Sequence, residues 1–226
     1  LASCDMDKEP YNALPDTEGI STPTDFANAR VGLYSGLRSS IEGNFYNAPE
    51  IQCDGFDAVT GFSNSLGDMY RYTFTSSTGY CETVYANYQA IMSRANYILD
   101  GWKKFVPKST YTADNLATVK TAVGDAYYTR AYSIFMLAEY FCADYEPETA
   151  DAANSGVSYR LDYAPSSNAS TYPARATMKE TMKQVSDDLD SAAVYITTQG
   201  EASYGYYTQD AITALRARMA LYTHDY

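Results

Sequence analysis

One segment, from about Thr112 to Phe141, constrains the fold of this chain more than any other. Its apolar residues recur at steps of three and four, which is the spacing of one face of an α-helix. From Tyr127 onward the other faces are also largely apolar, and such a helix must be surrounded by protein. The stripe consists of Leu116, Val119, Val123, Tyr127, Ala131, Ile134, Ala138 and Phe141. We therefore predict a long central helix with the rest of the chain packed around it.

Two helices are predicted before this central one. The first follows Thr22, a capping residue, with Pro23 in the first helical position and Asp25 three residues after the cap, and it ends at Gly43. The second runs from about 82 to 105 and carries one apolar stripe along its length.

Two more helices are predicted after it. The fourth opens with a capping box, Thr177 and Glu180, and continues to about Ile196. The fifth follows Thr208 and has alanines at repeated positions, which allow helix axes to approach closely in antiparallel pairs. The chain is therefore predicted to be all-α, with tetratricopeptide-like helix hairpins, although the tetratricopeptide consensus itself is absent.

Between the helices lie two long stretches, 42–79 and 142–176, that are rich in Gly, Ser, Asn, Asp and Tyr. Loops of this length in a compact domain are usually functional or disordered. The aromatic content of the first stretch favours order. We predict irregular but structured excursions, and we expect any binding site to lie there.

Charge and aromatic content limit the classes of partner. Lys and Arg number 16 against 28 Asp and Glu, a net charge of −12, which disfavours nucleic acid and anionic lipid headgroups. No run is long enough for a transmembrane helix. Tyrosine is unusually frequent, with 24 residues. Its ring can pack between helices or stack on a sugar while the hydroxyl forms a hydrogen bond.

Three cysteines lie in the body of the chain, Cys53, Cys81 and Cys142, and the first two lie in or beside the irregular stretch 42–79. At most one disulfide can form among them, with Cys53 and Cys81 as the pair to test, but three unpaired thiols are the preferred interpretation. With His224 as the single histidine, a metal site is not expected.

The first four residues, Leu1-Ala2-Ser3-Cys4, match the cleavage box of a bacterial lipoprotein. Cys4 is then the lipidation site, and the polar segment 5–10 is a tether. The lipid would be the only membrane anchor. This predicts a remnant and tether over residues 1–20 and one helical domain over 21–226.

Several segments together resemble the SusD/RagB family of outer-membrane nutrient-binding lipoproteins. The likeness begins with the lipobox and continues in the first helix, with Asp25 to Leu37. It is carried further by residues 88–99 ("YQAIMSRANYIL"), the "GDA…RAY" of 124–132, "PARAT" at 173–177 and "ALRAR" at 214–218. The segment after Phe141 departs from the family pattern, because it is longer and acidic.

The resemblance implies a function and a location. It implies a cell-surface, lipid-anchored protein of a Gram-negative, Bacteroidetes-like outer membrane. Such a protein binds an oligosaccharide and delivers it to a SusC-type TonB-dependent transporter, without catalysis and without a cofactor. The chain corresponds to the N-terminal half of the family's members, so we expect a fragment of a longer protein. A peptide ligand, or a helical protein-interaction module that binds no nutrient, remains an alternative.

The leading candidate ligand site precedes the second long helix and contains Asp68, Arg71, Tyr72 and Tyr80. It combines aromatic rings with one guanidinium and one carboxylate. The family's corresponding loop contributes to sugar binding, which by resemblance places Tyr80 and Arg71 near a ligand. A loop held in place by its own aromatic residues is an equally good interpretation.

The remaining charged candidates are interpreted as structural. Arg94 and Asn96 lie in the second long helix and are expected to bind backbone groups or nearby carboxylates. Arg130 lies in the central helix and needs an acidic partner, for which we expect Asp125 or Glu139.

Neither a calcium site nor a catalytic group is indicated by the sequence. Asp54, Asp57 and Asp68 fit no calcium-binding loop. There is no nucleophile–histidine arrangement and no distinctive carboxylate pair.

Overall fold

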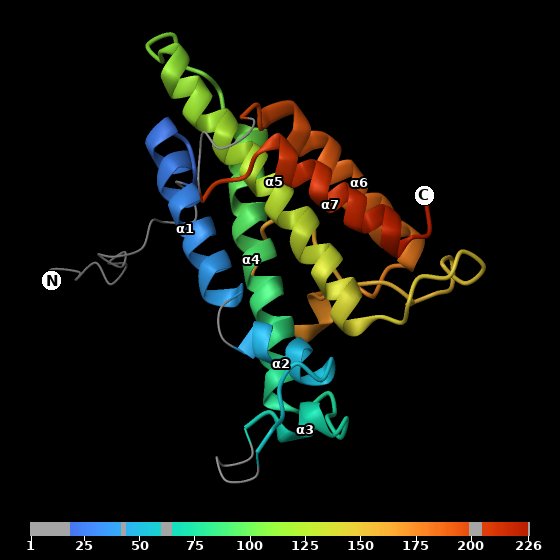
Figure 1. The fold of residues 1–226 in the computed structure, drawn as a ribbon. Coiled ribbons are helices and arrows are strands. Elements are labelled where there is room, and N and C mark those ends of the chain that lie inside the picture. The colour runs from blue at the N-terminus through green and yellow to red at the C-terminus, as the bar shows by residue number, and fades with distance from the viewer. Residues whose placement is uncertain (1–18, 42–43, 60–64, 199–204, 226) are drawn as a thin grey trace, which may run out of the picture.

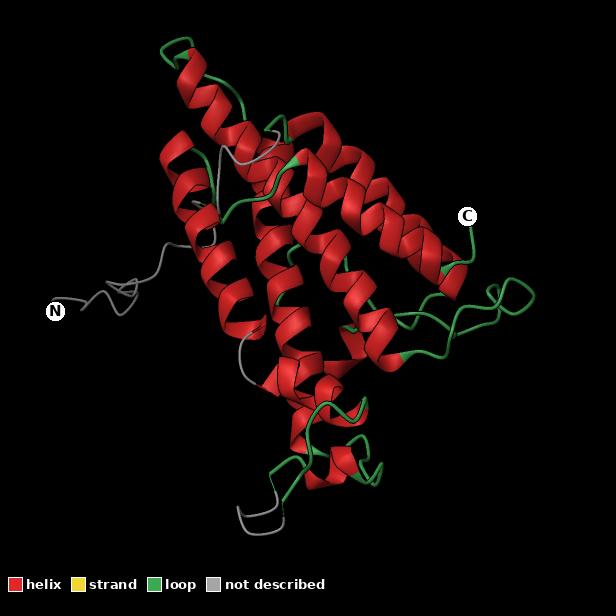
Figure 2. Ribbon diagram, in the orientation of Figure 1, coloured by secondary structure: helices red, strands yellow, loops and turns green. Residues whose placement is uncertain are grey.

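Five long helices run side by side in alternating directions (Figure 1). In this computed structural model, the described residues are 19–41, 44–59, 65–198 and 205–225. The long helices are α1 (Pro23–Ile41), α4 (Gly79–Lys104), α5 (Ala113–Phe141), α6 (Met178–Tyr195) and α7 (Gln209–Tyr222). The described residues contain helices and loops but no strand (Figure 2). The prediction of an all-α fold is confirmed.

The helix starts follow from local side-chain chemistry. Thr22 accepts from the backbone N–H of Asp25 at 3.2 Å, and the Asp25 carboxylate accepts from the N–H of Thr22 at 2.7 Å. Thr177 and Glu180 make the same reciprocal pair of bonds at the start of α6. Both capping arrangements are as predicted. They satisfy N–H groups that a helix cannot satisfy internally.

Helix α5 is the centre of the molecule, as predicted. It packs against α1, α4, α6 and α7. Most of its residues from Val119 to Ala138 are buried. Helices α5 and α6 approach closely at Gly124, where an added Cβ would lie 2.9 Å from both Tyr195 Cβ and Ile196 Cγ1.

The stretch 42–79 contains helices that the sequence did not predict. These are α2 (Asn44–Gln52) and the short α3 (Gly67–Tyr70), which are drawn at the lower end of the molecule in Figure 1. Helix α2 includes Pro49, which normally disfavours a helix interior. Its Ala48 and Ile51 are buried, so tertiary packing overrides a weak intrinsic preference. The second stretch, 142–176, is irregular as predicted, apart from the 3₁₀ turn Ala169–Thr171.

The partner of Arg130 was predicted wrongly. Its guanidinium binds both carboxylate oxygens of Asp188 on α6, with Nη2–Oδ1 at 2.6 Å and Nε–Oδ2 at 2.8 Å. Asp125 instead binds Arg30 of α1, with Nε–Oδ2 at 2.5 Å. Glu139 binds Arg218 of α7. Each acid pairs with an arginine of a neighbouring helix. Which arginine it meets depends on how the helices pack, and the order of residues in the chain does not reveal this.

No described helix combines the length and apolar character that a membrane span requires. Leu1 to Cys4, the tether and the predicted end of the first helix at Gly43 lie outside the described residues. The proposed boundary between residues 20 and 21 therefore stays a prediction.

A candidate ligand-binding face at the start of helix α4

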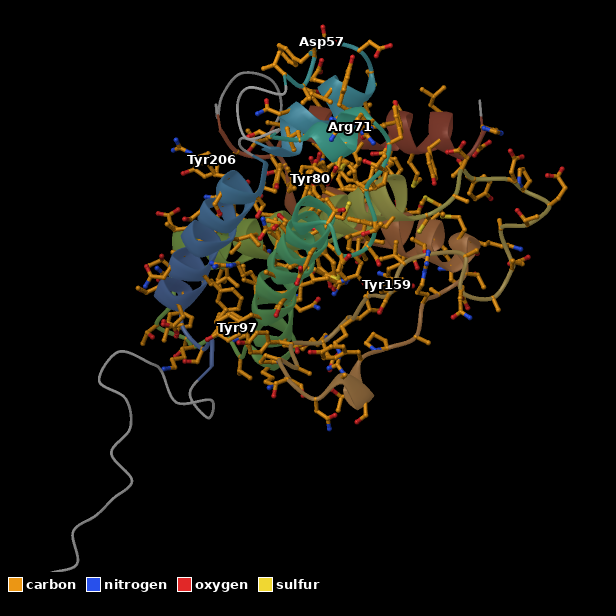
Figure 3. The ribbon with its side chains drawn as sticks, turned by 90° about the horizontal axis from the view of Figure 1, so that it is seen from below. Asp57, Arg71, Tyr80, Tyr97, Tyr159 and Tyr206 are labelled. Carbon is orange, nitrogen blue, oxygen red and sulfur yellow. The ribbon has the colours of Figure 1, made fainter. Side chains whose placement is uncertain are left out.

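The predicted site lies where α3 leads into α4, at the lower end of the bundle in Figure 1. Figure 3 looks at this end and shows Arg71 and Tyr80 there together with Asp57. Asp68 lies in the first turn of α3, and its Oδ1 is 3.5 Å from Arg71 Nη2. Both side chains are substantially exposed, so this contact holds their charges together with little net stabilisation.

Tyr72 is presented to solvent by an unusual backbone. Its φ of 54° lies in the left-handed region, which aromatic residues rarely adopt. Its hydroxyl donates to the carbonyl of Gln52 at the end of α2. The side chain nevertheless stays 64% exposed. Tyr70 donates from its hydroxyl to Asp57 Oδ1 at 3.2 Å. The loop is therefore fixed to the α2 end while one aromatic ring remains accessible.

Tyr80 differs from Asp68, Arg71 and Tyr72 because its polar group, the hydroxyl, is buried. This hydroxyl has no hydrogen-bond partner among the described residues. Burial raises its pKa, and the nearby Tyr140 and Cys81 add to the effect. The ring packs against the hydrophobic core. Tyr80 therefore supports the face from within.

Asp68 and Tyr80 line one open pocket of about 530 Å³. Arg71 is held at Asp68, while Tyr72 is held at α2. The structure therefore brings three of the predicted residues, Asp68, Arg71 and Tyr80, to one place and puts Tyr72 beside them. Whether they bind a ligand remains a proposal.

A larger feature is lined by other residues of α4 and was missed in the sequence. Along α4 runs a hollow of about 700 Å³ whose walls include Phe74, Tyr85, Tyr140 and Phe141. A second hollow of about 460 Å³ lies between α4 and the segment 158–173. The two hollows share Tyr85 and Ala86. We call this continuous surface the α4 groove.

The segment that forms one wall of the α4 groove is tied to α4 by side-chain amides. Gln89 Nε2 donates to the carbonyl of Ser158 at 2.8 Å. Asn96 Nδ2 donates to the carbonyls of Arg160 and Asp162 at 2.9 and 3.1 Å. Arg94 donates to the carbonyl of Gly32 on α1 at 3.0 Å. The predicted structural roles of Arg94 and Asn96 are confirmed, and Asn96 also fixes a wall of the groove.

Cys53, Cys81 and Cys142 are free, as the preferred interpretation predicted. Cys81 and Cys142 line the α4 groove, and burial raises the pKa of both thiols. Among the described residues there is no cluster of three or more His, Cys, Asp or Glu side chains that could hold a metal ion.

Solved structures share this fold. A SusD superfamily protein from Bacteroides thetaiotaomicron aligns with a TM-score of 0.67 at 19% identity, covering 90% of this chain and 43% of its own. A SusD-like carbohydrate binding protein from Bacteroides vulgatus aligns with a TM-score of 0.67 at 15% identity, covering 90% and 42%. A laminarin binding SusD-like protein aligns with a TM-score of 0.63 at 14% identity, covering 89% and 40%.

The chain thus spans less than half the length of these structural relatives. No curated protein matches its sequence. A family model does match, over residues 6–221: the SusD-like group described as starch-binding and associating with the outer membrane. This match covers nearly the whole chain and agrees with the resemblance of its helices, so the protein belongs to the SusD-like family.

Proposed function

We propose that this protein binds a glycan at the surface of the outer membrane and delivers it to a SusC-type TonB-dependent transporter. The family description and the laminarin-binding relative support a carbohydrate ligand. The observation that carries the proposal is the face at the start of α4, where the exposed ring of Tyr72 lies beside the Asp68–Arg71 pair. Ring faces stack on sugars, and a few fixed polar groups orient them.

Binding without turnover is part of the proposal. The family is described by what it binds. We expect the protein to retain a polysaccharide and to release no reducing sugar from it.

Affinity electrophoresis through gels that contain a soluble polysaccharide tests glycan binding. The protein should be retarded by at least one neutral polysaccharide. Changing Arg71→Ala together with Tyr72→Ala should reduce the retardation. Tyr80→Ala is a poor test, because Tyr80 packs against the core and its removal would disturb folding. Lys183→Ala is the matched control, since this exposed lysine pairs with Asp187 on α6, away from the face.

Retardation that the double variant leaves unchanged would exclude the loop as the site. Absence of retardation by every polysaccharide would favour the rival functions, a peptide-binding member of the family or a helical protein-interaction module.

Delivery requires a partner in the membrane. The protein, crosslinked in cells and purified, should bring with it a large outer-membrane receptor. Recovery of the protein alone under conditions that preserve known receptor complexes would contradict this part of the proposal.

A further inference from the structure

We propose that the α4 groove is a subsite for a neutral oligosaccharide, and that Tyr85 is its central contact. This inference rests on the proposed glycan-binding function and names the substrate class. The groove begins close to the candidate face in the chain, because Phe74, two residues after Tyr72, forms part of its wall.

Aromatic rings line both hollows of the groove. Tyr85 is shared by both hollows and contacts Phe141 edge to face, with ring centroids 5.3 Å apart. This contact fixes the Tyr85 ring and leaves 37% of the residue exposed. Phe74 at one end and Tyr172 at the other are also exposed. Rings held at intervals along an open groove suit successive sugar units of one chain.

The wall opposite α4 is held in place before any ligand arrives. Gln89 and Asn96 bind its backbone, as described above. Asn96 also accepts from Arg130 Nη1 at 2.9 Å, which links the wall to the buried Arg130–Asp188 pair. Ser158 Oγ donates to the carbonyl of Pro173 at 2.7 Å and closes the segment on itself. A preformed wall lowers the entropy that binding must overcome.

The charges along the groove select against acidic sugars. Its lining contains two acids, Glu82 and Asp162, and one base, Arg160. The Arg160 guanidinium donates to the carbonyls of Ala164 and Thr171 and lies 3.9 Å from Asp162 Oδ2. A uronate or sulfate in the groove would meet two carboxylates, Glu82 and Asp162, against the single guanidinium of Arg160, which already donates to two carbonyls. A neutral sugar meets no such penalty.

A second arginine, Arg175, lies at the edge of the α4 groove. Arg175 Nη2 donates to Cys142 Sγ at 3.3 Å, and its Nε donates to the carbonyl of Gly156 at 2.7 Å. It lies outside the lining residues. Arg160 and Arg175 are the two cations near a bound sugar, and Arg175→Gln gives the test a second variant.

The test is a glycan array that carries neutral, uronate-containing and sulfated oligosaccharides, followed by calorimetry on the strongest neutral ligand. We expect neutral glycans alone to bind. Tyr85→Ala should weaken binding by about tenfold, which corresponds to about 1.4 kcal/mol. Tyr206→Ala is the matched control. This exposed tyrosine lies beside α1, and Figure 3 places it toward the opposite side from Tyr159 of the groove wall. It should leave the affinity unchanged.

The outcomes separate the two proposals. Binding of acidic glycans overturns the neutral subsite but keeps glycan binding, and loss of that binding in Arg175→Gln would place the acidic group at Arg175. Neutral binding that Tyr85→Ala leaves intact in a folded variant, checked by circular dichroism, overturns the groove but not the function. Absence of binding to every glycan class overturns both.

Discussion

Arg130 shows at the scale of single residues how this bundle handles buried charge. It is buried in α5, and its guanidinium binds both oxygens of Asp188 and the side-chain oxygen of Asn96. Burial raises the pKa of Asp188, while the bonds from Arg130 and Gln184 lower it and offset part of the effect. The network joins α4, α5 and α6, and through Asn96 it reaches the groove wall.

Removing Arg130 should therefore be costly. Arg130→Met leaves Asp188 buried without its cation, and we expect the free energy of unfolding to fall by about 3–5 kcal/mol in urea denaturation. The loss should shrink as the pH falls, because a protonated Asp188 no longer needs a cation.

Two variants control this experiment. Arg130→Met combined with Asp188→Leu should recover much of the stability, because no unpaired charge remains. Lys183→Ala removes an exposed pair and should change stability by less than about 1 kcal/mol. If Arg130→Met is as mild as Lys183→Ala, the buried network is not a determinant of stability.

Asp25 offers a second test at the scale of single residues, because its pKa makes the stability of the protein depend on pH. Partial burial raises the pKa of its carboxyl, but hydrogen bonds from Ser21 and Thr22 outweigh this, so the net pKa lies below the usual 3.8. A lowered pKa in the folded state adds stability above pH 3.8 that is lost as the pH falls below this value.

Asp25→Ala should lower the free energy of unfolding by about 1 kcal/mol near neutral pH, because the backbone N–H groups of Ser21 and Thr22 lose the carboxylate that accepts from them. The difference between variant and parent should narrow below pH 3.8. Urea denaturation at several pH values measures both. A difference that stays constant with pH would show that the charge of Asp25 does not contribute.

At the scale of helices, the antiparallel packing depends on how closely neighbouring helix axes approach, as well as on the apolar stripe of each helix. Helix α5 lies against α6 with Gly124 at the contact, where Ile196 and Tyr195 leave no room for a side chain. The sequence predicted five long helices and two capping boxes, because periodicity and caps are local properties. It did not predict α2, because Pro49 disfavours a helix interior and the helix depends on the burial of Ala48 and Ile51.

Gly124→Ala should therefore destabilise the bundle, although alanine favours helices. An added Cβ must displace Ile196 and the α6 end, and we expect a loss of about 1–3 kcal/mol in urea or thermal unfolding. Gly79→Ala is the matched control. This glycine begins α4 and has no atom within 4 Å of an added Cβ, so the change should be neutral or stabilising by up to about 1 kcal/mol. An equal change in the free energy of unfolding at both positions would show that α5 and α6 can move apart without loss of stability.

At the scale of the whole molecule, the proposed function combines an acidic helical body with a membrane anchor. The net charge of −12 disfavours contact with anionic headgroups. Attachment through an acylated Cys4 would hold the body near the membrane without requiring its surface to bind lipid. Cys4 lies outside the described residues, so this attachment remains a proposal.

Cys4→Ala tests the anchor. In cells that process lipoproteins, the parent protein should incorporate labelled fatty acid and partition into the detergent phase. The variant should incorporate none and move to the aqueous phase, because no acyl chain remains to bury. Cys53→Ala, which changes an exposed thiol on the body, should behave like the parent. Detergent-phase partitioning of Cys4→Ala would contradict lipidation at this residue.

The sequence alone determined the helical class, the central position of α5, the helix caps and the family resemblance. Each depends on neighbours within a few residues or on a pattern along one segment. The candidate loop at Asp68, Arg71 and Tyr72 was also visible, because it concentrates aromatic and charged residues in a short stretch.

Only the tertiary structure decided which distant residues meet. It paired Arg130 with Asp188, turned the Tyr80 hydroxyl inward, and built the α4 groove from α4 and the segment 158–173. These contacts join residues far apart in the chain. Their pairing depends on how the helices pack, and a single sequence carries no direct record of it.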